Sequence, residues 1–133
     1  MTLAPEILRK LEFNEPAAAI AISKAEGDLR VKLPSDYVRF WHIGDGAVGP
    51  IGTEGFLQLW RVEELKPFND AESVNEYAPG LILFGSNGGG TGYAFDTHDA
   101  MAVVDVPFIG MSRAETRRLA ANFSAFLALM AKQ

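Results

Sequence analysis

The amino-acid sequence predicts an α+β fold with an antiparallel sheet, and three observations support this class. Before residue 45, apolar side chains recur every three or four residues, which is typical of helices. Between residues 56 and 106, short apolar runs alternate with turn residues, which is typical of strands. Helical spacing then returns, and helices followed by strands and a last helix are characteristic of α+β domains. The 133 residues, 48% of them apolar, suit one core, so we expect a single domain over residues 1–133.

Three helices are predicted before the strands. The first is short and covers residues 5–12. The second has Asn14 as its N-cap and ends at Gly27, because these residue types favour those positions. Residues 33–36 open the third helix and residues 44–46 break it, since proline and serine start helices and glycine interrupts them. One face of this third helix is heavily aromatic, with Tyr37, Phe40 and Trp41 at helical spacing.

The middle of the chain has the period of short strands and turns. Strands are predicted over residues 56–60, 81–84, 91–96 and 101–106, the last three forming a meander. Between the first two strands, we expect a helical turn over residues 62–65 and a weak, exposed helix over residues 70–77. Turns are predicted over residues 85–90 and 97–100.

A last helix is predicted to begin at Ser112. Glu115 stands three residues further on, and the two together form a capping box. An apolar stripe follows at helical spacing and is expected to face the core, made of Leu119, Phe123, Phe126, Leu127 and Met130.

Several protein classes are excluded by composition. The chain has no Cys, which excludes a disulfide scaffold, a thiol nucleophile and a thiolate metal site. The N-terminus lacks a secretory signal, and no apolar run approaches the roughly 18 residues that a membrane span needs. We therefore expect a cytoplasmic protein without membrane contact.

The charge is unevenly distributed along the chain, whose formal net charge is −5. Residues 62–105 carry eight carboxylates against Lys66 alone, a net charge of −7. Residues 106–133 carry four cations against Glu115, a net charge of +3. The acidic middle argues against direct nucleic-acid binding and suits a basic partner protein. A plain solvated acidic surface is the alternative interpretation.

Two glycine-rich motifs resemble phosphate-binding sequences without meeting their structural requirements. Residues 44–49 match GxGxxG, but a helix precedes them where a dinucleotide site needs a strand. The second motif resembles a phosphate loop, but Thr91 stands where its lysine should be, and Phe84 replaces the first glycine of a nucleophile elbow. A hairpin loop is favoured, with a backbone-lined pocket as the alternative, formed by Gly85, Ser86, Asn87, Gly88, Gly89 and Gly90.

No constellation of catalytic or metal-binding residues is evident. His42 and His98 are the only histidines, and neither belongs to a metal-binding motif. A triad built on Ser86 is not favoured by any spacing. We therefore expect no metal, no cofactor and no enzymatic activity.

Several segments together resemble the SUKH superfamily, specifically its SMI/KNR-type domain. The similar segments are residues 33–41 with 44–46, residues 57–60 with Glu64, Leu65 and Asn69, residues 84–96 and residues 122–127. Their order and spacing extend the resemblance from about residue 14 to residue 130. Asn87 stands where many members have aspartate.

The resemblance implies that the helices pack against one twisted, mostly antiparallel sheet and that the protein is not an enzyme. Many bacterial members are immunity proteins that bind and neutralise a toxin domain, often a nuclease, and fungal relatives regulate cell-wall synthesis and signalling. The family supplies no catalytic residues. Its motif residues are expected to be mainly structural, which leaves the partner-binding residues unmarked.

The leading hypothesis is a bacterial immunity protein, a monomer or weak dimer, that covers a basic cleft of its cognate toxin. The residues expected to bind this partner are Trp60, Glu63, Glu64, Asp70, Glu72 and Tyr93. The alternative is a regulatory scaffold or small-ligand-binding domain that uses the glycine-rich loop. An enzyme using Ser86, His42 or His98 ranks last.

Overall fold

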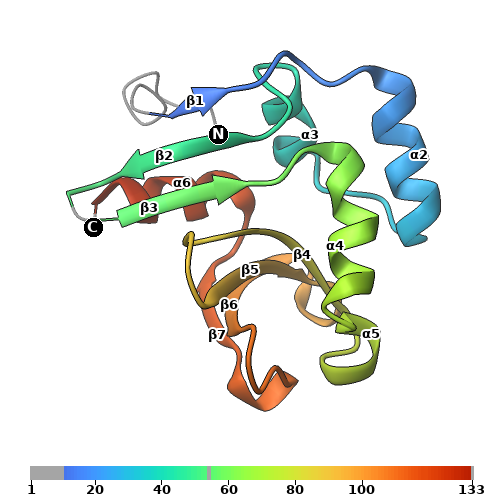
Figure 1. Ribbon diagram of the computed structural model, residues 1–133, viewed down its shortest axis with the longest axis vertical. Helices are drawn as coiled ribbons and strands as arrows, with labels where there is room; N and C mark the ends of the chain where they lie inside the picture. The colour runs from blue at the N-terminus through green and yellow to red at the C-terminus, as the bar shows by residue number, and fades with distance from the viewer. Residues whose placement is uncertain (1–10, 54, 133) are drawn as a thin grey trace.

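The computed structural model describes residues 11–53 and 55–132, and it is an α+β domain (Figure 1). In these residues seven strands form one sheet whose spatial order is the chain order, and every neighbouring pair is antiparallel. The strands are β1 (Glu12–Phe13), β2 (Ala47–Ile51), β3 (Gly55–Leu59), β4 (Leu81–Ser86), β5 (Thr91–Asp96), β6 (Ala102–Pro107) and β7 (Arg117–Ala120). The predicted fold class is confirmed.

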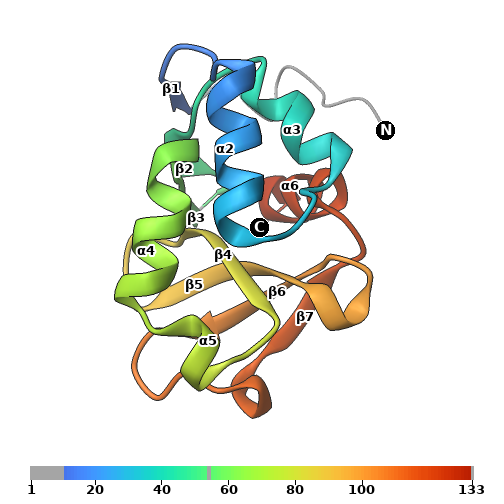
Figure 2. The same ribbon diagram turned by 90° about the vertical axis from the view of Figure 1, so that its right-hand side faces the viewer.

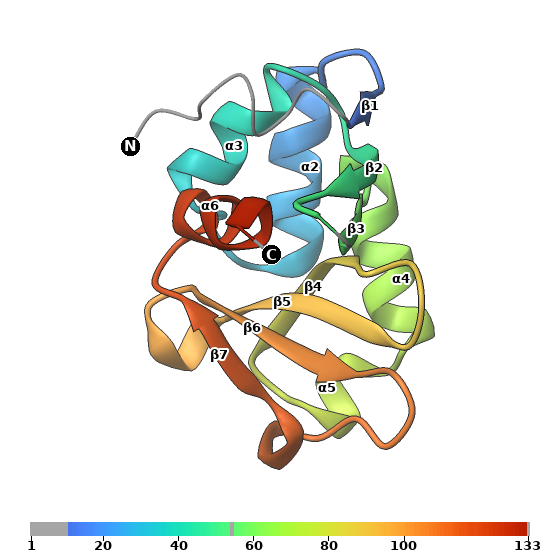
Figure 3. The same ribbon diagram turned by 90° about the vertical axis from the view of Figure 1, so that its left-hand side faces the viewer.

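Helices from the N-terminal, middle and C-terminal parts of the chain pack against the sheet. They are α2 (Ala19–Leu29), α3 (Ser35–Trp41), α4 (Leu65–Ala71), α5 (Val74–Tyr77) and α6 (Phe123–Lys132). Three 3-10 turns connect elements: η1 (Val62–Glu64), η2 (Thr97–Asp99) and η3 (Arg113–Glu115). Helix α2 stands between α4 and α3 (Figure 2), and α6 lies between α3 and the strands β5 to β7 (Figure 3).

Aromatic rings join the helices to the sheet in one core. Phe84 of β4 stacks on Phe95 of β5, with ring centroids 4.5 Å apart. The ring of Tyr37 on α3 contacts both of them and lies 4.9 Å from the ring of Phe123 on α6. These rings are at most 1% exposed, so the aromatic face predicted for the third helix packs in the core.

The N-terminal prediction was only partly correct. The helix expected over residues 5–12 lies mostly outside the described residues, and Glu12 belongs to strand β1. Helix α2 begins after Ala18, and Asn14 does not cap it, since the side chain of Asn14 donates to the Asp45 carbonyl at 2.8 Å. The helix also continues through Gly27 to Leu29, and a left-handed residue ends it at Arg30, whose φ is 58°.

The C-terminal helix begins eleven positions later than predicted, at Phe123 instead of Ser112. The side chain of Ser112 makes no capping hydrogen bond, so the expected capping box is wrong. Strand β7 takes up the intervening residues by pairing with β6. Asn122 is the real cap, since its Oδ1 accepts the Ala125 N–H at 2.8 Å.

Two corrections concern the middle of the chain. The helix expected over residues 70–77 is two helices, because Ser73 between α4 and α5 has a φ of 53°, which no α-helix contains. Gly85 and Ser86 belong to strand β4, so the turn of the glycine-rich hairpin is restricted to residues 87–90. The predicted strands over residues 56–60, 81–84, 91–96 and 101–106 are present with small shifts of their ends.

Candidate functional site

Two aspartates of the motif segments hold the fold together. Asp36 of α3 accepts the Tyr37 N–H through Oδ1 and the Ser124 N–H of α6 through Oδ2, each at 2.9 Å. Asp45 accepts the Val62 N–H at 2.7 Å and so fixes the start of η1. Each carboxylate satisfies an N–H group at a helix start that has no partner inside that helix. These motif residues therefore have structural roles.

The third motif segment also serves the sheet. A Cβ atom on Gly85 would lie 2.5 Å from the carbonyl oxygen of Gln58 on β3, so only glycine fits this contact between β3 and β4. Beyond the end of the β3 pairing, the carboxamide of Asn69 hydrogen-bonds both backbone polar groups of Leu83 on β4. The glycine and the asparagine therefore secure β4 at two nearby positions.

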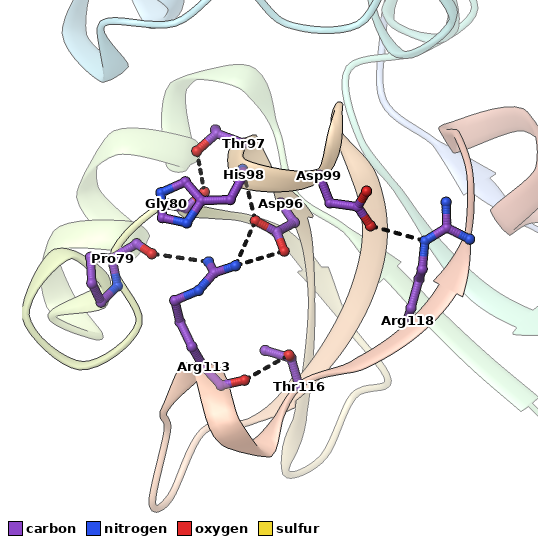
Figure 4. A network of polar contacts seen from close by, with 9 residues as sticks. All are labelled: Pro79, Gly80, Asp96, Thr97, His98, Asp99, Arg113, Thr116 and Arg118. Carbon is purple, nitrogen blue, oxygen red and sulfur yellow. Dashed lines mark hydrogen bonds and ion pairs between the residues drawn. The ribbon is translucent and has the colours of Figure 1, made fainter.

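Asp96 is the centre of a polar network at the end of β5 (Figure 4). Only 7% of Asp96 is exposed, and its two oxygens accept hydrogen bonds from Arg113 at 3.0 and 2.8 Å. The His98 N–H adds a third bond at 2.9 Å, and Arg113 also donates to the Pro79 carbonyl. Burial alone would raise the pKa of Asp96, but these hydrogen bonds outweigh it and hold the pKa below its ordinary value.

The imidazole ring of His98, which belongs to this network, packs against Gly80. A Cβ atom on Gly80 would lie 2.6 Å from Nε2 of His98, so the imidazole rests on a bare backbone. Within the residues that the structure describes, no three or more His, Asp or Glu side chains gather in a way that could hold a metal ion. Because the network joins the ends of β4, β5 and η3, it has the geometry of a structural clasp.

The glycine-rich loop uses its own side chains to satisfy its backbone. Oγ of Ser86 accepts the Gly88 N–H at 3.1 Å. Oδ1 of Asn87 accepts the N–H groups of Gly89 and Thr91 at 2.9 and 3.3 Å. These N–H groups would have to point outward in a backbone-lined anion pocket. These hydrogen bonds therefore support the interpretation of the segment as a hairpin loop. Ligand binding by residues 85–90 stays a prediction.

The two aromatic residues expected to anchor a partner are buried. Trp60 and Tyr93 are each 6% exposed. Phe68 of α4 covers Trp60 edge-on, with ring centroids 4.9 Å apart, and Tyr93 packs against Phe126 of α6 at the same distance. Little of either residue is therefore open to a partner.

The exposed aromatic residues of this region are two that the sequence analysis did not single out. Phe68 is 36% exposed on α4, and Tyr77 is 55% exposed on α5. The spacing of Glu64, Phe68 and Glu72, four residues apart, places them along one stripe of the helix. An aromatic residue placed four positions from a glutamate on either side is the sequence pattern that could have predicted its exposure.

Much of the acidic charge counted along the sequence is neutralised in the fold. Three aspartates on or beside β5 and β6 form ion pairs with the arginines of the C-terminal region, and the pairs are Asp96–Arg113, Asp99–Arg118 and Asp105–Arg117. Three arginines of residues 106–133 therefore offset three of the eight carboxylates counted in residues 62–105. Acidic charge survives mainly over η1, α4 and α5.

We call this region the α4–α5 surface, defined by Glu63, Glu64, Phe68, Asp70, Glu72, Glu76 and Tyr77. This surface contains all four of the predicted acidic residues. The predicted aromatic residues Trp60 and Tyr93 do not belong to it, because both are buried in the core. Two cations accompany the five carboxylates: Arg61 pairs with Glu63 at 3.0 Å, and Lys66 pairs with Asp70 at 2.7 Å. The formal net charge of the surface with these cations is −3. A hollow of about 400 Å³ between α2 and α4 borders it and is lined in part by Glu63, Lys66 and Pro67.

No helix in the described part of the chain has both the length and the apolar composition needed to cross a membrane. A comparison with curated proteins found no match. A scan against protein families matched residues 16–129 to the SMI1/KNR4 family (SUKH-1). The matched range contains all of the motif segments described above and most of the chain. The chain therefore belongs to the SMI1/KNR4 family (SUKH-1).

Proposed function

We propose that this protein is a non-enzymatic immunity protein that binds and neutralises a cognate bacterial toxin domain through the α4–α5 surface. Membership of the SMI1/KNR4 family supports a toxin-binding role, since many bacterial members of the superfamily act in this way. The chemistry of the surface supports a basic partner, because five carboxylates stand beside two paired cations. The protein would act in the cytoplasm of the cell that needs protection.

The single observation that carries this proposal is the stripe on α4. Glu64 and Glu72 flank Phe68, whose ring is partly exposed and rests on the buried Trp60. An aromatic anchor with a rigid base and charged neighbours is the arrangement found at the centre of many protein interfaces. Tyr77 on α5 offers a second exposed ring in the same region.

The proposed mechanism is occlusion of the toxin. Basic residues that line the nucleic-acid cleft of a nuclease would pair with the carboxylates of the α4–α5 surface, while Phe68 enters the cleft. Opposite charges also accelerate encounter between the two proteins, and this effect weakens as salt screens it. Occlusion needs no catalytic group on the immunity protein.

Co-expression with a toxin domain recovered by pull-down from the protein's own cells tests the proposal. The wild-type chain should restore growth and co-purify with the toxin at equal stoichiometry. The double variant Glu64→Lys/Glu72→Lys should lose both properties, because it reverses the charge on each side of Phe68. Glu64 Oε1 also accepts the Arg61 N–H at 2.9 Å, so the loss is attributed to charge only when the thermal melt of the variant matches that of the wild type. The control Glu12→Lys/Glu115→Lys makes the same charge change at exposed positions outside the α4–α5 surface and should protect normally.

Two outcomes would count against the proposal. If both double variants protect as well as the wild type, the α4–α5 surface is not the contact. If the wild-type chain neither binds the toxin nor restores growth, neutralisation itself is wrong, and ligand binding by the glycine-rich loop becomes the next hypothesis to test.

A further inference from the structure

A second surface, distinct from the α4–α5 surface, lies on the other side of α2. The groove between α2 and α3 has a volume of about 450 Å³. Its floor is apolar, because Ile22 and Leu33 are buried and Val38 is partly buried. Helix α2 stands between this groove and α4 (Figure 2), so the two surfaces do not overlap.

Ten lysines and arginines lie in the described residues, and four of them form no ion pair there: Arg30, Lys32, Arg39 and Lys132. Six cations have a carboxylate partner within ion-pair distance: Lys24, Arg61, Lys66, Arg113, Arg117 and Arg118. Lys32 and Arg39 line the groove, are exposed, and form no ion pair within residues 11–53 and 55–132. His42, one helical turn beyond Arg39, lines it as well.

The nearby carboxylates are already occupied by backbone groups. Glu26 lines the groove, but its Oε2 accepts the Leu33 N–H at 2.7 Å. Both oxygens of Asp36 on α3 accept N–H groups, one of them from α6. Glu26 keeps its negative charge while it accepts this bond, so the groove presents two cations and one carboxylate beside an apolar floor, a formal net charge of +1 in a chain whose formal net charge is −5.

We propose that the α2–α3 groove binds an acidic amphipathic segment of a partner protein. Apolar side chains of the segment would fill the floor over Ile22 and Val38, and its carboxylates would pair with Lys32 and Arg39. An apolar floor gives a peptide side chain something to bury, whereas a phosphate backbone would gain only the two cations. This proposal goes beyond toxin neutralisation, because it uses a separate surface and a partner of opposite charge.

A peptide titration followed by NMR tests this assignment. The probe is an amidated and acetylated peptide of about fourteen residues, with leucines at helical spacing and glutamates between them. Added to the ¹⁵N-labelled full chain, it should cause saturable shifts at the amides of Lys32, Val38 and Arg39. The same peptide with lysine at every glutamate position should cause no shifts at these amides, because the positive charges of the peptide and of the groove repel each other.

Variants separate the groove from general charge attraction. Lys32→Glu/Arg39→Glu should weaken peptide binding about tenfold, since both side chains are exposed and support no described ion pair. The matched control Arg30→Glu/Lys132→Glu changes the charge equally at exposed positions outside the groove that also form no described ion pair, and it should bind within about twofold of the wild type. Thermal melts of all variants should coincide closely, which excludes unfolding as the cause.

Three results would overturn the assignment. The first is an absence of saturable shifts up to about 1 mM peptide, the weakest range of specific recognition. The second is a response centred on other residues or equal for the lysine peptide. The third is tighter binding of an oligothymidylate at Lys32 and Arg39, which would identify the groove as a nucleic-acid contact. Glu64→Lys/Glu72→Lys should leave peptide binding intact, so failure of toxin neutralisation and failure of this proposal give different results.

Discussion

The side chain of Asn69 takes the place of a neighbouring strand for Leu83. Its Oδ1 accepts the Leu83 N–H at 2.8 Å, and its Nδ2 donates to the Leu83 carbonyl at 3.0 Å. Strand β3 pairs with β4 only at Ser86 and Gly85, so it does not reach Leu83. A third bond, from Nδ2 to the Leu65 carbonyl at 2.8 Å, ties the carboxamide to its own helix. The position of α4, and with it the α4–α5 surface, therefore depends on this contact.

Replacing Asn69 should be costly for stability. In Asn69→Ala, two buried backbone groups of Leu83 lose their partners, and we expect the free energy of unfolding to fall by about 3 kcal/mol. Asn69→Asp should also destabilise, since a carboxylate cannot donate to the two carbonyls. Urea denaturation measures both effects. A loss below about 1 kcal/mol for Asn69→Ala would mean that another group replaces the carboxamide.

Asp36 should stabilise the start of α6 from a distance of 88 positions in the sequence. Its Oδ2 accepts the Ser124 N–H, while Asn122 accepts the Ala125 N–H from within the same turn. Asp36→Ala and Asn122→Ala should each lower the free energy of unfolding by about 1 kcal/mol, the usual effect of removing a helix cap. Chemical denaturation of the single and double variants checks this. Because the two acceptors cap consecutive N–H groups of one helix turn, the loss in the double variant should differ from the sum of the two single losses.

The clasp around Asp96 predicts a dependence of stability on pH. The pKa of Asp96 is lower in the folded chain than its ordinary value of 3.8, so the unfolded chain takes up a proton first as pH falls. The stabilisation is present at neutral pH, and it is lost as pH falls from about 5 through the folded pKa. Asp96→Asn should reduce this acid-induced loss.

Asp99→Asn is the control for the Asp96 experiment, because Asp99 forms an ion pair in which both side chains are more than half exposed. Urea midpoints measured between about pH 7 and pH 3 should show a flatter profile for Asp96→Asn than for Asp99→Asn. Equal slopes for the two variants would contradict a special role of Asp96. At neutral pH, Asp96→Asn should also cost about 2 kcal/mol, because it weakens hydrogen bonds to a charged group.

The fold could be predicted from sequence where neighbouring segments decide the structure. The strands of the meander were found because each is a compact apolar run bounded by turns, and each pairs with the next one in the chain. Strand β2 was missed because Gly49 and Pro50 interrupt its pattern. Strand β7 was missed because Arg117 and Arg118 are both exposed, so the alternation typical of a half-buried strand is absent.

The candidate site was predictable in charge but not in detail. Its carboxylates lie together because η1, α4 and α5 are consecutive in the sequence. That Phe68 is the partly exposed aromatic residue and Trp60 the buried one depends on how their rings pack, which is a tertiary contact. Pairing of Asp105 with Arg117 across two strands likewise required the sheet register.

The contrast between carboxylates with and without an ion pair in the described residues gives the sharpest prediction. Glu64→Gln/Glu72→Gln and Asp99→Asn/Asp105→Asn change the formal charge equally and lie in the same acidic stretch of sequence. In the fold, the first pair flanks Phe68, whereas the second is already paired with Arg118 and Arg117. Only the glutamate variant should slow association with the toxin, by about tenfold at low salt, because only these charges face the basic partner.

Stopped-flow association at a series of salt concentrations measures this difference. The glutamate variant should also lose most of the salt dependence of the association rate, since salt screens the charges that it lacks. The aspartate variant should stay within about twofold of the wild type and keep its salt dependence. Equal slowing of both variants would show that the toxin responds to the net charge of −5 as a whole, and the α4–α5 surface would then have no privileged role.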